Sequence, residues 1–223
     1  MKRGIAVSGP WRTILFGTGA CFCWGALSLT FVLFQIKAPE VGLGVVGAAL
    51  KFFTYLTHLT VLGIALVFTS GALRTGSLKR WCSARPALLS AILVYAILMF
   101  GGYQFMLAGS WDPKGAWKAS SVSLHYVVPL MYACFWFFSV KHGALRWSHV
   151  LTWQLFPVAY AALVLVAGGA TGEYPYPFLE VEQLGWMPVL SNMGVVLAGC
   201  IATSALVVGT DRLLAARVLD RAL

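Results

Sequence analysis

Six long stretches of this chain contain no Asp, Glu, Lys or Arg, and together they make up most of its 223 residues. They are 22 to 28 residues long and cover 13–36, 52–73, 86–111, 119–140, 147–172 and 183–210. The hydrocarbon core of a bilayer, roughly 30 Å thick, is crossed by about 20 apolar residues in a helix. The pattern therefore predicts six transmembrane helices.

The composition favours the same fold class, an all-α integral membrane protein. Hydrophobic residues make up 60% of the chain and charged residues only 10%, whereas soluble domains carry about 25% charged residues. Six apolar helices would leave too little polar surface to face water. We expect one domain over residues 1–223, a single six-helix bundle with helices at approximately 12–35, 51–73, 86–109, 119–140, 148–170 and 187–210.

The charged residues alternate between the two sides of this predicted bundle. Twelve of the sixteen basic residues fall on one side: Lys2, Arg3, Arg12, Arg74, Lys79, Arg80, Arg85, Lys141, Arg146, Arg212, Arg217 and Arg221. The opposite side holds five of the seven acids: Glu40, Asp112, Glu173, Glu180 and Glu182. The positive-inside rule then predicts cytoplasmic N- and C-termini in a multi-pass protein of the inner (plasma) membrane. The net charge of +9 is explained by this topology, so no nucleic-acid partner is predicted.

The five cysteines are not arranged as a disulfide framework. Four lie within apolar stretches, and Cys82 lies in a predicted cytoplasmic loop. Cys21 and Cys23 project to different sides of a helix, which disfavours a metal site. We predict no disulfide, no metal and no cofactor.

Ionisable groups within a membrane are costly and are therefore candidate functional residues. His125 lies about 9 Å into the fourth predicted helix by helical rise. Pro129, four residues later, cannot donate a hydrogen bond to the carbonyl of His125. Because lipid cannot satisfy that carbonyl, we expect a polar cavity beside His125.

The second predicted helix carries Thr54, Thr57 and His58 close to its outer end. Thr54 and His58 are spaced i, i+4 and are expected to share a helix face. A hydroxyl and an imidazole that enter from the same side on two helices are the minimal parts of a base-activated nucleophile. Asn192 and the loop acids, Glu180 among them, are possible partners for these groups.

Three segments resemble the androgen-induced-gene and androgen-dependent TFPI-regulating family of six-helix membrane hydrolases. They are 51–56 (KFFTYL), 125–129 (HYVVP) and 176–180 (YPFLE). Animal members of that family are threonine hydrolases of fatty-acid esters of hydroxy fatty acids, and this chain looks like a bacterial branch. The resemblance implies Thr54 as nucleophile and His125 as base, with membrane lipids as surroundings and a lipid ester as substrate.

Other assignments remain open from the sequence. His58 is a rival base, and Asn192, Tyr126, Tyr176 and Glu180 are possible supporting residues. A small-solute transporter, a non-catalytic membrane protein and a di-haem carrier are the alternative functions. The oligomeric state is not indicated.

Overall fold

The computed structural model describes residues 10–73, 85–109 and 111–220. Within these ranges the chain forms helices and loops, with no β-strand. The α-helices are α1 (Pro10–Lys37), α2 (Val45–Phe53), α3 (Leu56–Ala72), α5 (Pro86–Gly102), α6 (Gly115–Val122), α7 (Val128–Ser139), α8 (Ser148–Thr152), α9 (Leu155–Thr171), α10 (Val181–Leu184) and α11 (Trp186–Asp220). Four short turns complete them, two 3₁₀ (Ala38–Val41, Pro177–Leu179) and two π-helical (Tyr103–Leu107, Ser123–Val127).

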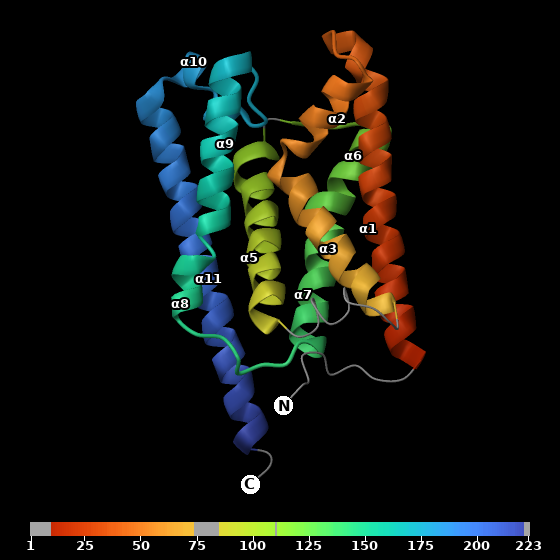
Figure 1. The fold of residues 1–223 in the computed structure, drawn as a ribbon, viewed down its shortest axis with the longest axis vertical. Helices are drawn as coiled ribbons and strands as arrows, with labels where there is room; N and C mark the ends of the chain where they lie inside the picture. The colour runs from red at the N-terminus through yellow and green to blue at the C-terminus, as the bar shows by residue number, and fades with distance from the viewer. Residues whose placement is uncertain (1–9, 74–84, 110, 221–223) are drawn as a thin grey trace.

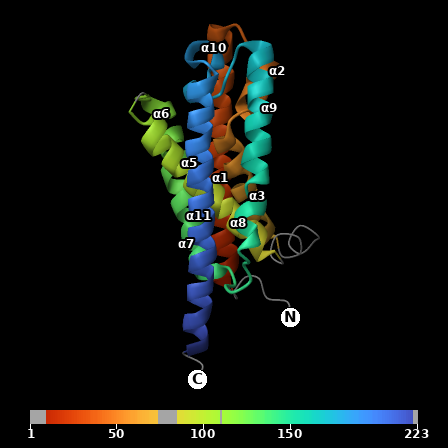
Figure 2. The same cartoon turned by 90° about the vertical axis from the view of Figure 1, so that its left-hand side faces the viewer.

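The helices run side by side along the long axis of the molecule (Figures 1 and 2). Among the described residues, five helical segments are long and apolar enough to cross a membrane, and a sixth is added if α2 and α3 form one bent span. The all-helical fold class is thus confirmed. The beginning of α1 and the end of α11 lie at the same end of the bundle, as an even number of spans requires.

One predicted helix is interrupted. The segment expected as a single helix over 51–73 consists of α2 and α3, whose axes differ by 78°. Tyr55, at the junction, has an extended backbone (φ −85°, ψ 125°). As a result α2 lies across one end of the bundle and not along it (Figure 1).

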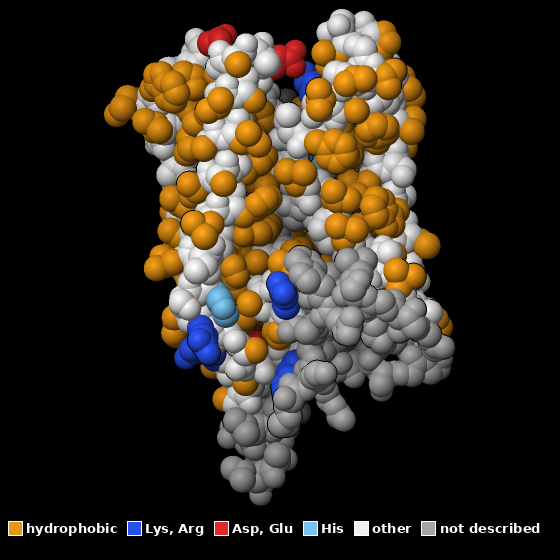
Figure 3. Space-filling model, in the orientation of Figure 1, with side chains coloured by type: hydrophobic (Ala, Val, Ile, Leu, Met, Phe, Trp, Pro, Cys, Tyr) orange, Lys and Arg blue, Asp and Glu red, His pale blue; other side chains and the backbone are white. Residues whose placement is uncertain are grey.

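Hydrophobic side chains cover the flank of the bundle, and charged side chains gather at its two ends (Figure 3). Glu173 pairs with Lys51 at the end that includes α2. Arg146 and Arg212 lie at the opposite end, where the Arg212 guanidinium sits 5.5 Å from the ring centroid of Trp147. Several residues of the predicted basic side, and Cys82, lie outside the described residues: Lys2, Arg3, Arg74, Lys79, Arg80 and Arg221.

Aromatic rings from α1, α3 and α7 form the centre of the core. Phe16, Phe68 and Phe135 are almost fully buried, and their ring centroids are 5.3 to 6.2 Å apart in edge-to-face contacts. Gly71 lets α3 approach α1, since a Cβ at this position would lie 1.9 Å from the Phe16 ring. Close packing of α1 on α3 therefore depends on this glycine.

A smaller apolar cluster holds the loop between α9 and α11. Leu179 of this loop packs with Val164 of α9 and Val189 of α11. Tyr174 lies directly over Gly168, where a Cβ would come within 2.2 Å of its ring. The loop is thus a packed element, and it carries Tyr176 towards the start of α3.

We expect Gly71→Ala to lower the free energy of unfolding by about 1–3 kcal/mol, because the Phe16 ring is held by its neighbours and cannot move aside. Thermal unfolding of detergent-solubilised protein measures the change. Gly17→Ala is the matched control, since nothing lies within 4 Å of a Cβ at that position on α1. Equal melting temperatures for the two variants would contradict the packing assigned to Gly71.

Candidate active site

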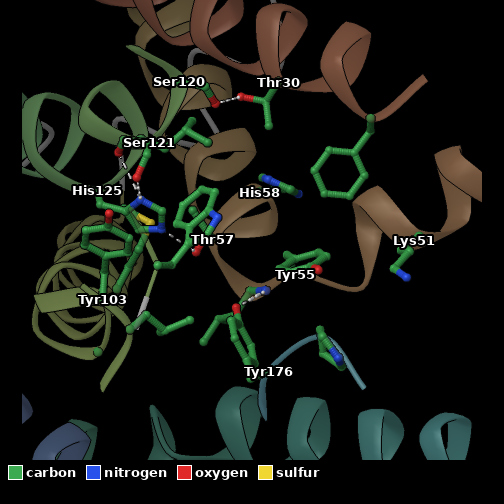
Figure 4. Close-up of a pocket in the computed structure, with 18 of the residues that line it drawn as sticks. Thr30, Lys51, Tyr55, Thr57, His58, Tyr103, Ser120, Ser121, His125 and Tyr176 are labelled. Carbon is green, nitrogen blue, oxygen red and sulfur yellow. Dashed lines mark hydrogen bonds between the residues drawn. The ribbon is translucent and has the colours of Figure 1, made fainter. Parts of the chain in front are cut away.

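A cavity of about 630 Å³ lies in the half of the bundle that includes α2. Its walls come from α1, α2, α3, α5, α6 and the loop that carries Tyr176 (Figure 4). Most lining side chains are apolar, and the volume is typical of small-molecule sites, which span about 300–1,000 Å³. The polar lining residues are Thr30, Lys37, Lys51, Tyr55, Thr57, His58, Tyr103, Ser120, Ser121, His125 and Tyr176.

A threonine and a histidine from different helices meet in this cavity. Thr57 is the second residue of α3, and its Oγ1 lies 3.4 Å from Nε2 of His125. This separation is somewhat longer than a tight hydrogen bond, as is common for nucleophile and base in a site without substrate. The cavity expected beside His125 is present but mostly apolar, and the hydroxyl next to His125 in it belongs to Thr57.

The protonation of His125 follows from its second nitrogen. Nδ1 lies 2.9 Å from the backbone carbonyl oxygen of Ser121. Because a carbonyl only accepts hydrogen bonds, Nδ1 carries the proton and Nε2 presents a lone pair to Thr57. The carbonyl therefore has the orienting role that a carboxylate has in other sites of this kind.

The histidine sits in an irregular part of its helix. The π turn Ser123–Val127 separates α6 from α7, and the backbone N–H of Val128 reaches back five residues to the carbonyl of Ser123. A second π turn begins at Tyr103, whose ring stacks on the imidazole of His125 at 4.0 Å between centroids. Single π turns occur often at functional sites. Here they bring the two rings into contact.

Thr54 lies at the end of α2, outside the residues that line the cavity. Its hydroxyl donates to the carbonyl of Lys51 at 2.7 Å. The helix face that Thr54 and His58 were expected to share does not exist, because the chain is extended at Tyr55 between them. The hydroxyl next to His125 belongs instead to Thr57, three residues further along.

His58 lines the cavity and is buried, with 5% of its surface exposed. Its Nδ1 donates to the carbonyl of Phe52 at 2.6 Å, and its ring stacks on the Phe52 ring at 4.0 Å. Figure 4 shows His58 directed away from Thr57. The contacts of His58 thus connect α3 to the end of α2.

The four predicted supporting residues occupy different surroundings. Tyr126 donates to Oε1 of Gln104 at 2.7 Å, and Asn192 donates to the carbonyl of Phe178 at 3.0 Å. Neither lines the cavity, nor does Glu180, at the start of α10. Tyr176 does line it. Among the loop acids, Glu173 pairs with lining residue Lys51 at 2.6 Å.

Two tyrosine hydroxyls hold the junction between α2 and α3. Tyr160 of α9 donates to the carbonyl of Thr54 at 2.6 Å. The backbone N–H of Leu56 donates to the hydroxyls of Tyr160, at 3.1 Å, and Tyr176, at 3.0 Å. These contacts satisfy backbone groups that the interruption leaves without a helical partner, and they determine where Thr57 lies.

No family model matches the chain, and comparisons with curated proteins and with solved structures find no match either.

Thr57, Ser121 and Tyr103 have site contacts that sequence reasoning did not assign to them. Ser121 precedes His125 by four residues, so their positions on one helix face indicate the contact. No glycine or proline marks the junction at 54–55, and only that junction turns Thr57 towards His125. Tyr103 comes from a distant helix, and the sequence holds no comparable signal for it.

We expect Tyr160→Phe to lower the free energy of unfolding by about 1 kcal/mol, because the carbonyl of Thr54 loses its donor. Hydrogen exchange at the amides of residues 54–58 should accelerate in this variant. An unchanged exchange rate at these amides would contradict the role of Tyr160 at the junction. Tyr126→Phe is the control, since it removes a tyrosine hydroxyl that donates to Gln104 and not to the junction.

Proposed function

We propose that this chain is a membrane-embedded hydrolase of lipid esters, with Thr57 as nucleophile and His125 as base. The observation that carries the proposal is the contact between Oγ1 of Thr57 and Nε2 of His125 in an apolar cavity. The bond from Nδ1 of His125 to the carbonyl of Ser121 adds the group that orients a base. Nucleophile, base and orienting group are the signature of covalent catalysis.

The reaction takes place in two halves. Oγ1 of Thr57 attacks the ester carbonyl carbon while its proton passes to Nε2 of His125, and the carbonyl electron pair moves onto oxygen. Collapse of this oxyanion expels the alkoxide, which takes the proton from His125 and leaves as an alcohol. Water then attacks the acyl-threonine, with His125 as base, to release the fatty acid and restore Thr57.

A lipid substrate is supported by the lining of the cavity and by its surroundings. Apart from the polar group around Thr57 and His125, the walls are built from side chains such as Phe34, Leu98 and Leu124. Esters with long acyl chains partition into a bilayer, where helices of this length and apolarity also belong. By the charge distribution, the protein lies in the plasma membrane with cytoplasmic termini and the cavity near the outer leaflet.

The resemblance of segments 51–56, 125–129 and 176–180 to hydrolases of fatty-acid esters of hydroxy fatty acids supports the same reaction. A transport pathway across the bundle has less support, because the buried rings of Phe68, Tyr132 and Phe135 fill the core beyond the cavity.

Covalent labelling with a long-chain fluorophosphonate tests the proposal. We expect Thr57→Ala to reduce the labelling rate by about 1,000-fold or more and His125→Ala to reduce it by about 10²–10⁴-fold. Thr57→Ser retains a hydroxyl and should keep part of the activity. Mass spectrometry of the labelled peptide identifies the modified side chain.

The matched control is Thr54→Ala, which removes a hydroxyl from the same segment outside the cavity. This variant should label like the wild type. Labelling that persists in Thr57→Ala and disappears in Thr54→Ala would return the nucleophilic role to Thr54. If the probe labels neither Thr54 nor Thr57, the hydrolase proposal is refuted.

A further inference from the structure

We infer that Tyr176 is a third catalytic residue, whose hydroxyl donates a hydrogen bond to the oxyanion formed when Thr57 attacks an ester carbonyl. The inference rests on the proposed function and deepens it. An ester hydrolase needs a donor beside its nucleophile, because the negative charge appears on the carbonyl oxygen about 3 Å from the attacking atom.

The position of Tyr176 fits this role. It lines the cavity together with Thr57 and His125, and its hydroxyl lies beside the side chain and the backbone of Thr57. Figure 4 shows the ring entering the cavity from the loop, with its hydroxyl at the start of α3 and opposite His125 across Thr57. An ester carbonyl in reach of Thr57 therefore has the imidazole on one side and the phenol on the other.

The hydroxyl of Tyr176 has a proton to offer. Its oxygen accepts the N–H of Leu56 at 3.0 Å, and the backbone of Thr57 makes a second contact to it. Backbone N–H groups are donors only, so they occupy lone pairs of the phenol. Its O–H group also contacts the side chains of Thr57 and Tyr160, and a substrate carbonyl bound beside Thr57 would compete with these hydroxyls for its proton. Hydrogen bonds into a phenol oxygen also polarise its O–H bond and strengthen it as a donor.

The hydroxyl proton of the neighbouring Tyr160 has a different acceptor. Its proton is donated to the carbonyl of Thr54 at 2.6 Å, and its side chain does not line the cavity. The two tyrosines thus share the N–H of Leu56 and differ in the use of their protons. Both phenols hold the junction through Leu56, and Tyr176 in addition lines the cavity.

Tyr176 also stays protonated at working pH. Burial raises the pKa of its phenol above the ordinary value, and this outweighs the hydrogen bonds with Thr57, Tyr160 and Leu56 that lower it. A donor group must keep its proton in the resting enzyme, and a raised pKa ensures this throughout the neutral range.

The loop fixes the ring in place before substrate arrives. Pro175 and Pro177 flank Tyr176, and a residue before proline is restricted to extended conformations, as observed here (φ −135°, ψ 134°). The ring stacks on Phe178 at 5.2 Å and meets Tyr55 edge-on at 5.7 Å. A donor held in this way needs no rearrangement as charge develops.

Tyr176→Phe tests the inference, since it retains both ring contacts and removes only the hydroxyl. We expect the acylation rate with an umbelliferyl ester of a long-chain fatty acid to fall by about 100-fold, the usual effect of removing one such donor. A long-chain trifluoromethyl ketone, which forms a tetrahedral oxyanion adduct, should lose affinity by a similar factor. A non-hydrolysable ether analogue of the ester should bind as it does to the wild type.

The control is Tyr126→Phe, which removes a tyrosine hydroxyl that donates to Gln104 outside the cavity and should leave acylation unchanged. Equal loss of affinity for the ketone and the ether would show that Tyr176 only shapes the cavity and would overturn the inference. An unchanged acylation rate in Tyr176→Phe would overturn it as well. Failure of the wild type to form any Thr57-linked adduct is a separate result that refutes the hydrolase and, with it, the role of Tyr176.

Discussion

A membrane-spanning segment cannot leave backbone groups unsatisfied, because lipid offers no hydrogen-bond partner. The junction between α2 and α3 interrupts the helical ladder, and side chains from elsewhere in the chain provide partners for its backbone groups. Tyr160 donates to the carbonyl of Thr54, and Tyr160 and Tyr176 accept the N–H of Leu56. These contacts hold the backbone at the junction, where the axes of α2 and α3 differ by 78°, and Thr57 lies just beyond it.

Irregular backbone occurs in three of the segments that carry polar or aromatic residues around His125. The junction at 54–55 carries Thr57, the π turn Ser123–Val127 contains His125, and the π turn Tyr103–Leu107 begins with the residue that stacks on His125. Regular helices would direct these side chains along separate faces and satisfy all backbone groups internally. The carbonyl of Ser121, just before the π turn, accepts a hydrogen bond from Nδ1 of His125. Local backbone irregularity and candidate chemistry therefore coincide.

The two halves of the bundle have different tasks. The half near the basic end is packed around Phe16, Phe68 and Phe135, with Gly71 permitting close approach of α1 and α3. The other half contains the cavity and is completed by α2 and by the loop between α9 and α11. A tightly packed half can hold the helices in register while the open half retains space for a ligand.

The sequence by itself determined the class of fold and the histidine of the candidate site. Charge-free stretches long enough to cross a bilayer, and Pro129 four residues after His125, are local patterns with direct physical consequences. The identity of the hydroxyl beside His125 was decided by the tertiary structure. Thr54 and Thr57 are close in sequence and chemically alike, and only the junction between them, held by tyrosines more than 100 residues away, turns Thr57 into the cavity. A prediction from hydrophobic periodicity takes the helix to be unbroken. An interruption that is stabilised by distant side chains has no signal in the sequence of the segment that it bends.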